Sequence, residues 1–306
     1  MAATTRDRYR RPALAAELNR AYTVEIMVRI TVLGSGSRGN AILVDGSEGS
    51  VLVDAGFSAR TIAQRLLAVE RQPESINALL LTHEHVDHAS GATASCSRWG
   101  WPVVASQGTL AALADMASGA PAVTQALAAN APTQVAGFSV EHHAVPHDAA
   151  DCRALVLTDT RSGARVGVVL DAGHVPDTLP AFLAHLDLLV IEANHDTTML
   201  ANGPYPRALK ARIRGGSGHL SNTTSATLAA DCAHRGLRGV LLAHLSETNN
   251  TPEIAVATAR DILRRAGWHS DALWACPQRA PMTPVDLNGP SAAWHGIPRA
   301  TQLALF

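Results

Sequence analysis

The chain has 306 residues, of which 47% are hydrophobic and 17% charged, with a formal net charge of −1. This balance is typical of a globular protein with a large core, and it excludes a whole-molecule basic field of the kind that attracts nucleic acid. The four cysteines include no CxxC pair, which argues against a cysteine-based zinc knuckle and favours reduced thiols in a cytoplasmic protein. The sequence shows neither a secretory apolar segment nor an apolar run of membrane-spanning length, so we expect no membrane association.

The hydrophobic pattern predicts strands and helices along most of the chain. Residues 1–25 show no sustained period and are expected to form a flexible N-terminal extension. The predicted strands are 28–34, 40–46, 50–56, 77–83, 101–106, 138–147, 154–160, 165–173, 186–194 and 239–246. The predicted helices are 59–69, 88–99, 107–116, 221–236 and 251–267.

The order of these elements predicts the fold class. Strands come first as hairpins and then alternate with helices, and this pattern restarts in the second half of the chain. Such a pattern indicates an α/β protein in which two sheets pack together with helices outside, a four-layer αββα sandwich. We expect one domain over residues 26–270 and a Pro-rich tail over residues 271–306.

The turn at residues 34–39 matches GxGxxG, but a strand and not a helix follows it, so the dinucleotide-binding interpretation fails. Its backbone N–H groups could still hold a phosphate as a nest, which makes Ser35, Ser37 and Arg38 candidate substrate contacts. A tight turn between two strands explains the same residues equally well.

The strongest signal is THEHVDH at residues 82–88, directly after a buried strand. In extended backbone, His83 and His85 point the same way because side chains alternate with period two. Asp87 and His88, at the turn into the next helix, can face a second point. Imidazole and carboxylate ligands suit Zn, Mn or Fe, so this loop predicts ligands for two adjacent metal ions.

One loop cannot complete two metal sites, so further ligands are expected where other buried strands end. Asp54, His147, Asp171 and His244 each stand at such a position. Ligands in α/β folds gather at strand ends, which makes these four residues the best candidates.

With an upstream Asp and later His, Asp and His at strand ends, HxHxDH resembles the metallo-β-lactamase fold over residues 28–267. The resemblance implies one metal on His83, His85 and His147, and a second on Asp87, His88 and His244. It also implies that Asp171 bridges the two ions and that Asp54 supports the ligand loop.

Several short motifs together resemble the WalJ (YycJ) group of metal-dependent nucleases, which is related to RNase Z. These motifs are LGSGSRGN, LVDAGFS, THEHVDH, VPHD, IEANHD, NGPYP, GHLSN and HLSETNN. One departure is LDAGHV at 170–175, where relatives more often carry TDTGYV.

The resemblance implies a catalytic set of Asp87, Glu192 and His219. A metal-held hydroxide would attack phosphorus, and His219, oriented by Glu192, would protonate the leaving 3′-oxygen. The implied activity is a 5′-to-3′ exonuclease on single-stranded DNA in repair or replication, with RNA as a second candidate substrate.

The segment 207–219 is basic, and Arg207, Lys210 and Arg214 share one helical face in it. Such a face beside a phosphodiester centre could bind backbone phosphates, although a solvated helix surface has the same pattern.

The C-terminal peptide resembles the motif by which bacterial replication and repair proteins dock into the sliding clamp. Gln302 would supply hydrogen bonds, and Leu303, Leu305 and Phe306 apolar anchors. A terminal strand packed on the protein's own core is the alternative.

Two other functions fit the same fold. One is a small-molecule hydrolase of the lactonase or thioesterase kind, and the other is a non-catalytic DNA-repair scaffold. The complete ligand set argues against the scaffold, and Glu192, His219 and the basic segment argue against the small-molecule hydrolase.

Overall fold

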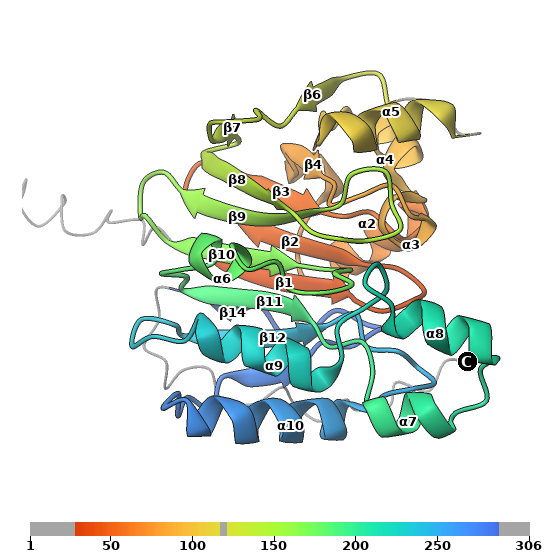
Figure 1. Cartoon of the computed structure of the whole chain (residues 1–306). Coiled ribbons are helices and arrows are strands. Elements are labelled where there is room, and N and C mark those ends of the chain that lie inside the picture. The colour runs from red at the N-terminus through yellow and green to blue at the C-terminus, as the bar shows by residue number, and fades with distance from the viewer. Residues whose placement is uncertain (1–27, 117–120, 288–306) are drawn as a thin grey trace, which may run out of the picture.

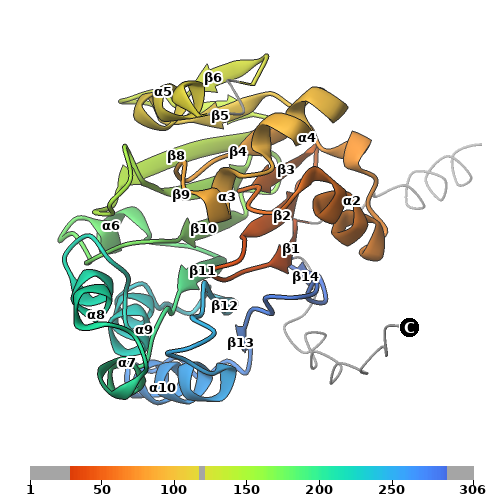
Figure 2. The same ribbon diagram turned by 90° about the vertical axis from the view of Figure 1, so that its right-hand side faces the viewer.

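Two mixed β-sheets lie at the centre of the molecule, and helices cover the outer side of each (Figure 1, Figure 2). The computed structural model describes residues 28–116 and 121–287. The predicted N-terminal extension, 1–25, and the C-terminal peptide, 302–306, lie outside the described residues. The predicted αββα sandwich is confirmed.

The first sheet is built from the N-terminal half of the chain and one C-terminal strand. Its spatial order is β14 (Val285–Asp286), β1 (Arg29–Gly34), β2 (Ala41–Asp45), β3 (Ser50–Val53), β4 (Ala78–Leu80), β5 (Val103–Ala105) and β6 (Thr124–Ala126). The strands β1 to β3 pair antiparallel, whereas β3 to β6 pair parallel. Parallel strands require crossovers, which contain α2 (Ala59–Ala68), η1 (Pro73–Ser75), α3 (Val86–Ala89), α4 (Ala92–Trp99) and α5 (Gln107–Asp115).

The second sheet repeats this plan. Its spatial order is β13 (Leu273–Ala275), β12 (Gly239–Ala243), β11 (Leu188–Glu192), β10 (Arg165–Val169), β9 (Arg153–Asp159), β8 (Phe138–Ala144) and β7 (Thr133–Val135). Pairing is antiparallel from β7 to β10 and parallel from β10 to β13. The helices of this half are α6 (Leu179–Phe182), α7 (Thr197–Asn202), α8 (Arg207–Arg214), α9 (Asn222–Asp231) and α10 (Pro252–Arg265).

The largest apolar cluster lies between the two sheets and contains Ile42, Phe138 and Val190, all fully buried. Separate clusters pack each sheet against its helices, with Leu66 of α2 in one and Leu263 of α10 in the other. The central strands are therefore buried on both faces, which explains their continuous apolar runs. Each such Leu, Ile or Phe contributes about 1.5–3 kcal/mol by leaving water.

Hydroxyl side chains begin the longer helices. Ser58, Ser106, Ser221 and Thr251 each accept the backbone N–H three residues on, at α2, α5, α9 and α10. These caps satisfy N–H groups that have no partner within the helix.

Several predicted strands are two to four residues shorter in the structure, and three other predicted boundaries are wrong in ways that matter for the fold. The predicted helix 88–99 is two helices, α3 and α4, because Gly91 N–H donates to Ala55 at 2.8 Å and a side chain there would strike Phe57 O. The predicted helix 221–236 already ends at Asp231. The folded body continues through residues 271–287, which the sequence assigned to the tail.

Within 271–287, β13 pairs parallel with β12, and β14 pairs antiparallel with β1. An ion pair between Arg29 Nε and Asp286 Oδ1, 2.6 Å apart, adds to the β14 contact. These strands have three and two residues, which is too short to show a hydrophobic period. The strands β6 and β7 were not predicted for the same reason, since each has only three residues.

Among the described residues, no helix combines the length and apolarity that crossing a bilayer requires.

Candidate metal centre and its pocket

The polar residues predicted at strand ends meet at one edge of the two sheets. The first sheet supplies Asp54 after β3 and the loop 82–88 after β4. The second sheet supplies His147 after β8, Asp171 after β10 and His244 after β12. Asp54, Asp171 and His244 have φ angles of 62°, 56° and 50°, a region unfavourable for residues other than glycine. Such strained backbone gathers at functional sites, where the surrounding fold holds it in place.

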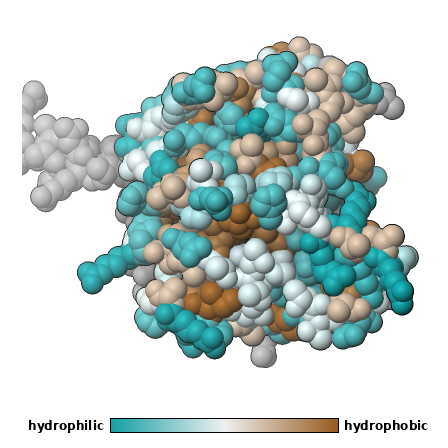
Figure 3. All heavy atoms as spheres, in the orientation of Figure 1, coloured by the Kyte–Doolittle hydropathy of each residue, from teal (hydrophilic) through white to brown (hydrophobic). Residues whose placement is uncertain are grey.

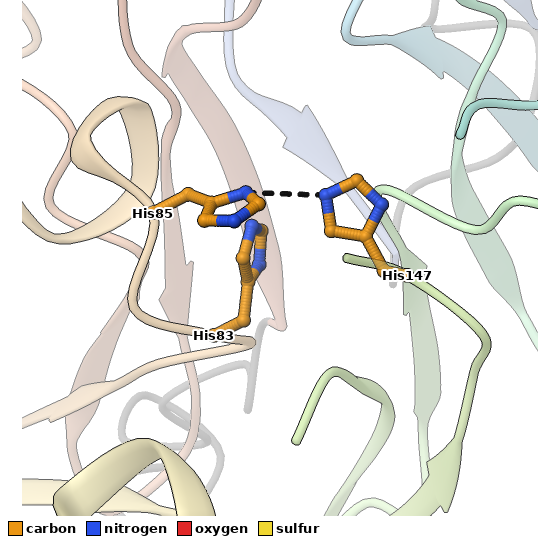
Figure 4. A group of neighbouring side chains, drawn as sticks. All are labelled: His83, His85 and His147. Carbon is orange, nitrogen blue, oxygen red and sulfur yellow. Dashed lines mark hydrogen bonds between the residues drawn. The ribbon is translucent and has the colours of Figure 1, made fainter. Parts of the chain in front are cut away.

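His83, His85 and His147 form the first donor group, with one nitrogen of each within 4.8 Å of the others. Figure 4 shows the three rings converging, two from the loop after β4 and one from the loop after β8. His147 Nε2 lies 3.2 Å from His85 Nδ1. The ring of His83 is fully buried between them, and its Nε2 has no hydrogen-bond partner.

Asp87, His88, Asp171 and His244 form the second donor group. His88 Nε2 lies 2.7 Å from Asp171 Oδ2, and His244 Nδ1 lies 2.5 Å from Asp171 Oδ1. Asp171 Oδ2 is also 3.3 Å from His83 Nε2 of the first group. The carboxylate of Asp171 therefore lies between the two groups, and all seven predicted ligands come together.

The donor atoms fit divalent metal ions. His83 Nε2 and His244 Nδ1 are buried without an aligned hydrogen-bond partner. A buried polar atom left in this way costs about 1–3 kcal/mol. Imidazole nitrogen and carboxylate oxygen are ligands that Zn and Mn accept, and a cation bound at each donor group would satisfy these two atoms.

The electrostatics of the site favour the metal-binding forms of His83 and Asp171. Burial holds the pKa of His83 well below its usual value, which keeps the ring neutral with a lone pair for a metal. Burial would raise the pKa of Asp171, but His244, His88 and a hydrogen bond from His219 hold it well below its usual range. Asp171 is therefore a buried anion among histidines.

Asp54 lies behind the loop 82–88 and contacts two of its residues. Its fully buried carboxylate accepts Thr82 N–H at 2.8 Å and lies 2.7 Å from His88 Nδ1. Burial alone would lower the pKa of His88, but Asp171 and Asp54 raise it to about 10. A partner on Nδ1 orients the ring and leaves Nε2 toward Asp171.

Glu192 and His219 form a pair beside Asp171. Glu192 Oε1 accepts the backbone N–H groups of Ala172 and Leu220, at 2.5 and 3.2 Å, and this fixes the buried carboxylate. Its Oε2 lies 3.2 Å from His219 Nδ1, which is also 3.2 Å from Asp171 Oδ1. Burial alone would lower the pKa of His219, but hydrogen bonds to Asp171 and Glu192 raise it to about 9.

A cavity of about 260 Å³ opens beside the donor groups. His85, Asp87, Asp171 and His219 line its polar side, and Tyr205, Leu209, Arg212 and Ile213 line the side toward α8. The donors are thus accessible to a ligand, and His219 lines the same space while its partner Glu192 is fully buried.

Comparisons with known proteins agree with this geometry. Residues 34–152 match the model of the metallo-beta-lactamase superfamily. Exodeoxyribonuclease YycJ of Bacillus anthracis is 30% identical over 242 residues, which cover 79% of this chain and 91% of the relative. Exodeoxyribonuclease WalJ of Streptococcus pneumoniae serotype 2 is 31% identical over 246 residues, 79% of this chain and 90% of the relative.

The chain belongs to the metallo-β-lactamase superfamily, in the WalJ (YycJ) group. It is therefore a metal-dependent hydrolase, and the predicted family is confirmed. Solved structures agree at the level of the fold. YhfI of Bacillus subtilis, 16% identical, has a TM-score of 0.64 with 85% of this chain and 99% of its own covered. The short form of human tRNase Z, 15% identical, has a TM-score of 0.57 with coverages of 83% and 98%.

The Gly-rich turn of this WalJ-type chain contributes less to the pocket than its residues suggested. Ser37 lines the cavity. Ser35 is fully buried, and its Oγ accepts His244 N–H and donates to Asn40 Oδ1, both at 2.8 Å, so it positions backbone. Arg38 is outside the cavity lining, with Nε 2.8 Å from Glu247 Oε2.

Helix α8 turns a different face to the pocket from the predicted basic one. Figure 3 shows a hydrophilic surface over α8. Arg207, Lys210 and Arg214 are absent from the cavity lining, and Lys210 Nζ donates to the carbonyl of Ala201 at 2.7 Å. Instead Arg212 lines the cavity, with its Nη2 2.6 Å from Asp148 Oδ2.

Arg212 and Tyr205 are pocket residues to which the sequence assigned no role. Arg212 lies three residues after Leu209, so a helical wheel that included apolar positions could have placed it on the pocket face. Tyr205 lies between two prolines in NGPYP. This motif contributed to the family resemblance, but none of its residues was given a role.

Proposed function

We propose that this chain is a dinuclear metal-dependent exonuclease that removes nucleotides from the 5′ end of single-stranded DNA, in repair or replication. The observation that carries the proposal is His219, which lines the cavity together with Asp171 and Arg212 and lies 3.2 Å from the buried Glu192. The names of its relatives, exodeoxyribonucleases at 30–31% identity, support the same substrate class.

The donor groups support two ions, one on His83, His85 and His147 and one on Asp87, His88 and His244, with Asp171 between them. Two divalent ions there would polarise a phosphodiester and an attacking water. The chain's own residues orient these donors: Asp54 fixes His88, and the loop after β8 carries His147.

His219 is proposed to supply the proton that the leaving 3′-oxygen needs. Its Nδ1 faces Glu192 Oε2 and Asp171 Oδ1, which leaves Nε2 as the nitrogen for the pocket. Glu192 acts by orientation, because its other oxygen is held by two backbone N–H groups. A positioned acid of this kind contributes about 10²–10⁴-fold to rate.

End-labelled oligonucleotides test the proposal, as single- and double-stranded DNA and as RNA, with Mn²⁺ or Zn²⁺ added. We expect stepwise release of mononucleotides from the 5′ end of single-stranded DNA. The Asp87→Ala, His88→Ala double variant should lose this activity together with bound metal. Cleavage of lactone or thioester substrates but not of DNA would favour the small-molecule hydrolase instead, and a double variant as fast as the parent would contradict the dinuclear centre.

The C-terminal peptide with Gln302, Leu303, Leu305 and Phe306 is proposed to bind the bacterial sliding clamp in the cytoplasm. Its composition, one amide followed by apolar anchors, suits a short docking peptide. Clamp pull-down with the full chain and with a chain ending at residue 301 tests this; equal capture of both would end the idea.

A further inference from the structure

The α8 side of the pocket has no part in metal binding, yet it is partly apolar. Tyr205, Leu209 and Ile213 line the same cavity as the donor residues and are each only partly buried. A phosphate with two metal ions needs no apolar wall. A ligand that fits both sides must carry a phosphate at one end and a flat, weakly polar group at the other.

We propose that Tyr205, Leu209 and Ile213 form a nucleobase wall that seats one unpaired nucleotide of the substrate strand. The proposal rests on the nuclease function proposed above. The cavity volume of about 260 Å³ lies just below the usual range for small-ligand sites, ~300–1,000 Å³, and therefore suits one nucleotide. A paired base lies inside its duplex and cannot reach such a wall, so the wall selects a single strand.

The backbone at Tyr205 is restricted before substrate arrives. Tyr205 stands between Pro204 and Pro206, in the four-residue connection between α7 and α8. Proline fixes its own φ angle and confines the residue before it to extended backbone. A tyrosine held in this way loses little conformational entropy on binding a base, which favours affinity.

The wall is also fixed to the metal ligands. His219 N–H donates to the carbonyl of Ile213 at 2.9 Å, and His147 Nδ1 lies 3.0 Å from the carbonyl oxygen of Gly218. Arg212 ties the same helix to Asp148, the residue after ligand His147. The distance between a base on the wall and a phosphate at the donors is therefore set by the fold.

Arg212 supplies a positive charge for the phosphate next to the base on the wall. Its side chain is 66% exposed at the cavity, so its guanidinium can contact the phosphate that follows. Aromatic stacking with an arginine beside it is the usual means of holding single strands without sequence preference.

A scan with abasic nucleotides tests the wall. Single-stranded oligonucleotides carry one abasic site at the first, second or third position from the attacked end, and kcat/KM is measured with Mn²⁺. We expect one position at which loss of the base slows the parent enzyme by about 5- to 100-fold, the range of base–aromatic stacking. Tyr205→Ala should abolish this difference, while Tyr205→Phe keeps it.

Arg207→Ala is the matched control, because Arg207 lies on α8 outside the cavity lining. It should leave the difference unchanged. Equal rates on normal and abasic strands at every position would overturn the wall while leaving the nuclease function intact. A discrimination that survives in Tyr205→Ala would also overturn it, and absence of any cleavage by the parent would overturn both proposals. If Tyr205→Ala does not fold, the rates of the parent enzyme on normal and abasic strands still test the nucleobase wall.

Discussion

Asp54 shows how single residues behind the ligands determine the metal centre. It is fully buried, has a φ of 62°, and links the backbone of Thr82 to the ring of His88. No solvent can replace these contacts at that depth. The contacts of its carboxylate with Thr82 and His88 offset part of the cost of the strained backbone.

Asp54→Asn should weaken metal binding by about 10- to 100-fold, the usual effect of losing a partner behind a ligand. The amide keeps the size of the side chain but presents a donor to groups that already donate. Competition with a chelator, followed by metal analysis, measures the change. Asp159→Asn is the control, since Asp159 accepts Ser47 and Ser162 N–H groups at the far end of β9. It should reduce stability without changing metal affinity; unchanged affinity in Asp54→Asn would refute the role.

Glu192→Gln tests whether Glu192 acts through His219. His219→Ala should lower the single-turnover rate about 10²- to 10³-fold with bound metal retained. Glu192→Gln alone should lower it less, and the double variant should be no slower than His219→Ala, because both changes remove one function. Losses that multiply would show that Glu192 has a separate role, and metal loss in His219→Ala would exclude the proton-donor assignment.

At the scale of elements, the junction between β10 and α8 sets the shape of the pocket. Gly173 follows β10, and a side chain there would lie 2.3 Å from Gly216 O and 2.5 Å from Ser217 Cα. The chain after α8 can approach the metal loop this closely because position 173 has no Cβ. That approach places Gly218 against His147.

Gly173→Ala should therefore destabilise the protein by about 1–3 kcal/mol, the range for overpacking, and lower kcat/KM by moving α8 from the donors. Thermal unfolding and kinetics measure the two effects. Gly216→Ala is the matched control from the same contact, since its nearest neighbour would be His174 Nδ1 at an ordinary 3.7 Å. Equal effects of the two variants would show that close packing at position 173 is not the cause.

At the scale of the whole molecule, the candidate metal centre joins the two sheets. Loops of the first sheet carry His83 and His88, and loops of the second carry His147, Asp171 and His244. An ion bound there would link both halves of the chain, so metal binding would contribute to folding stability.

Metal removal should lower the melting temperature. Ligand present at a thousandfold excess over Kd stabilises by about 4 kcal/mol, which at about 2–4 °C per kcal/mol predicts a loss of roughly 8–16 °C on chelation. Calorimetry before and after chelation measures it. A His83→Ala, His88→Ala variant should show no such difference, and an unchanged melting temperature in the parent would contradict a metal link between the sheets.

The amino-acid sequence alone determined the layers and predicted the donor residues that the structure brings together. Buried strands show as apolar runs, and polar side chains such as Asp171 and His244 at their ends stand out because a core position cannot hold them without a partner. The prediction of Glu192 and His219 as a pair came from the family resemblance, and the structure brings them within 3.2 Å.

Only the tertiary structure decided which side of α8 faces the site and how far the folded body extends. The basic residues of α8 suggested one face, but the cavity is lined by Leu209, Arg212 and Ile213, because apolar contact orients an amphipathic helix more strongly than exposed charge. The strands β13 and β14 carry no period of their own and exist through pairing with distant partners. The local sequence pattern therefore indicated the chemistry of each side chain, and long-range packing determined which residues it contacts.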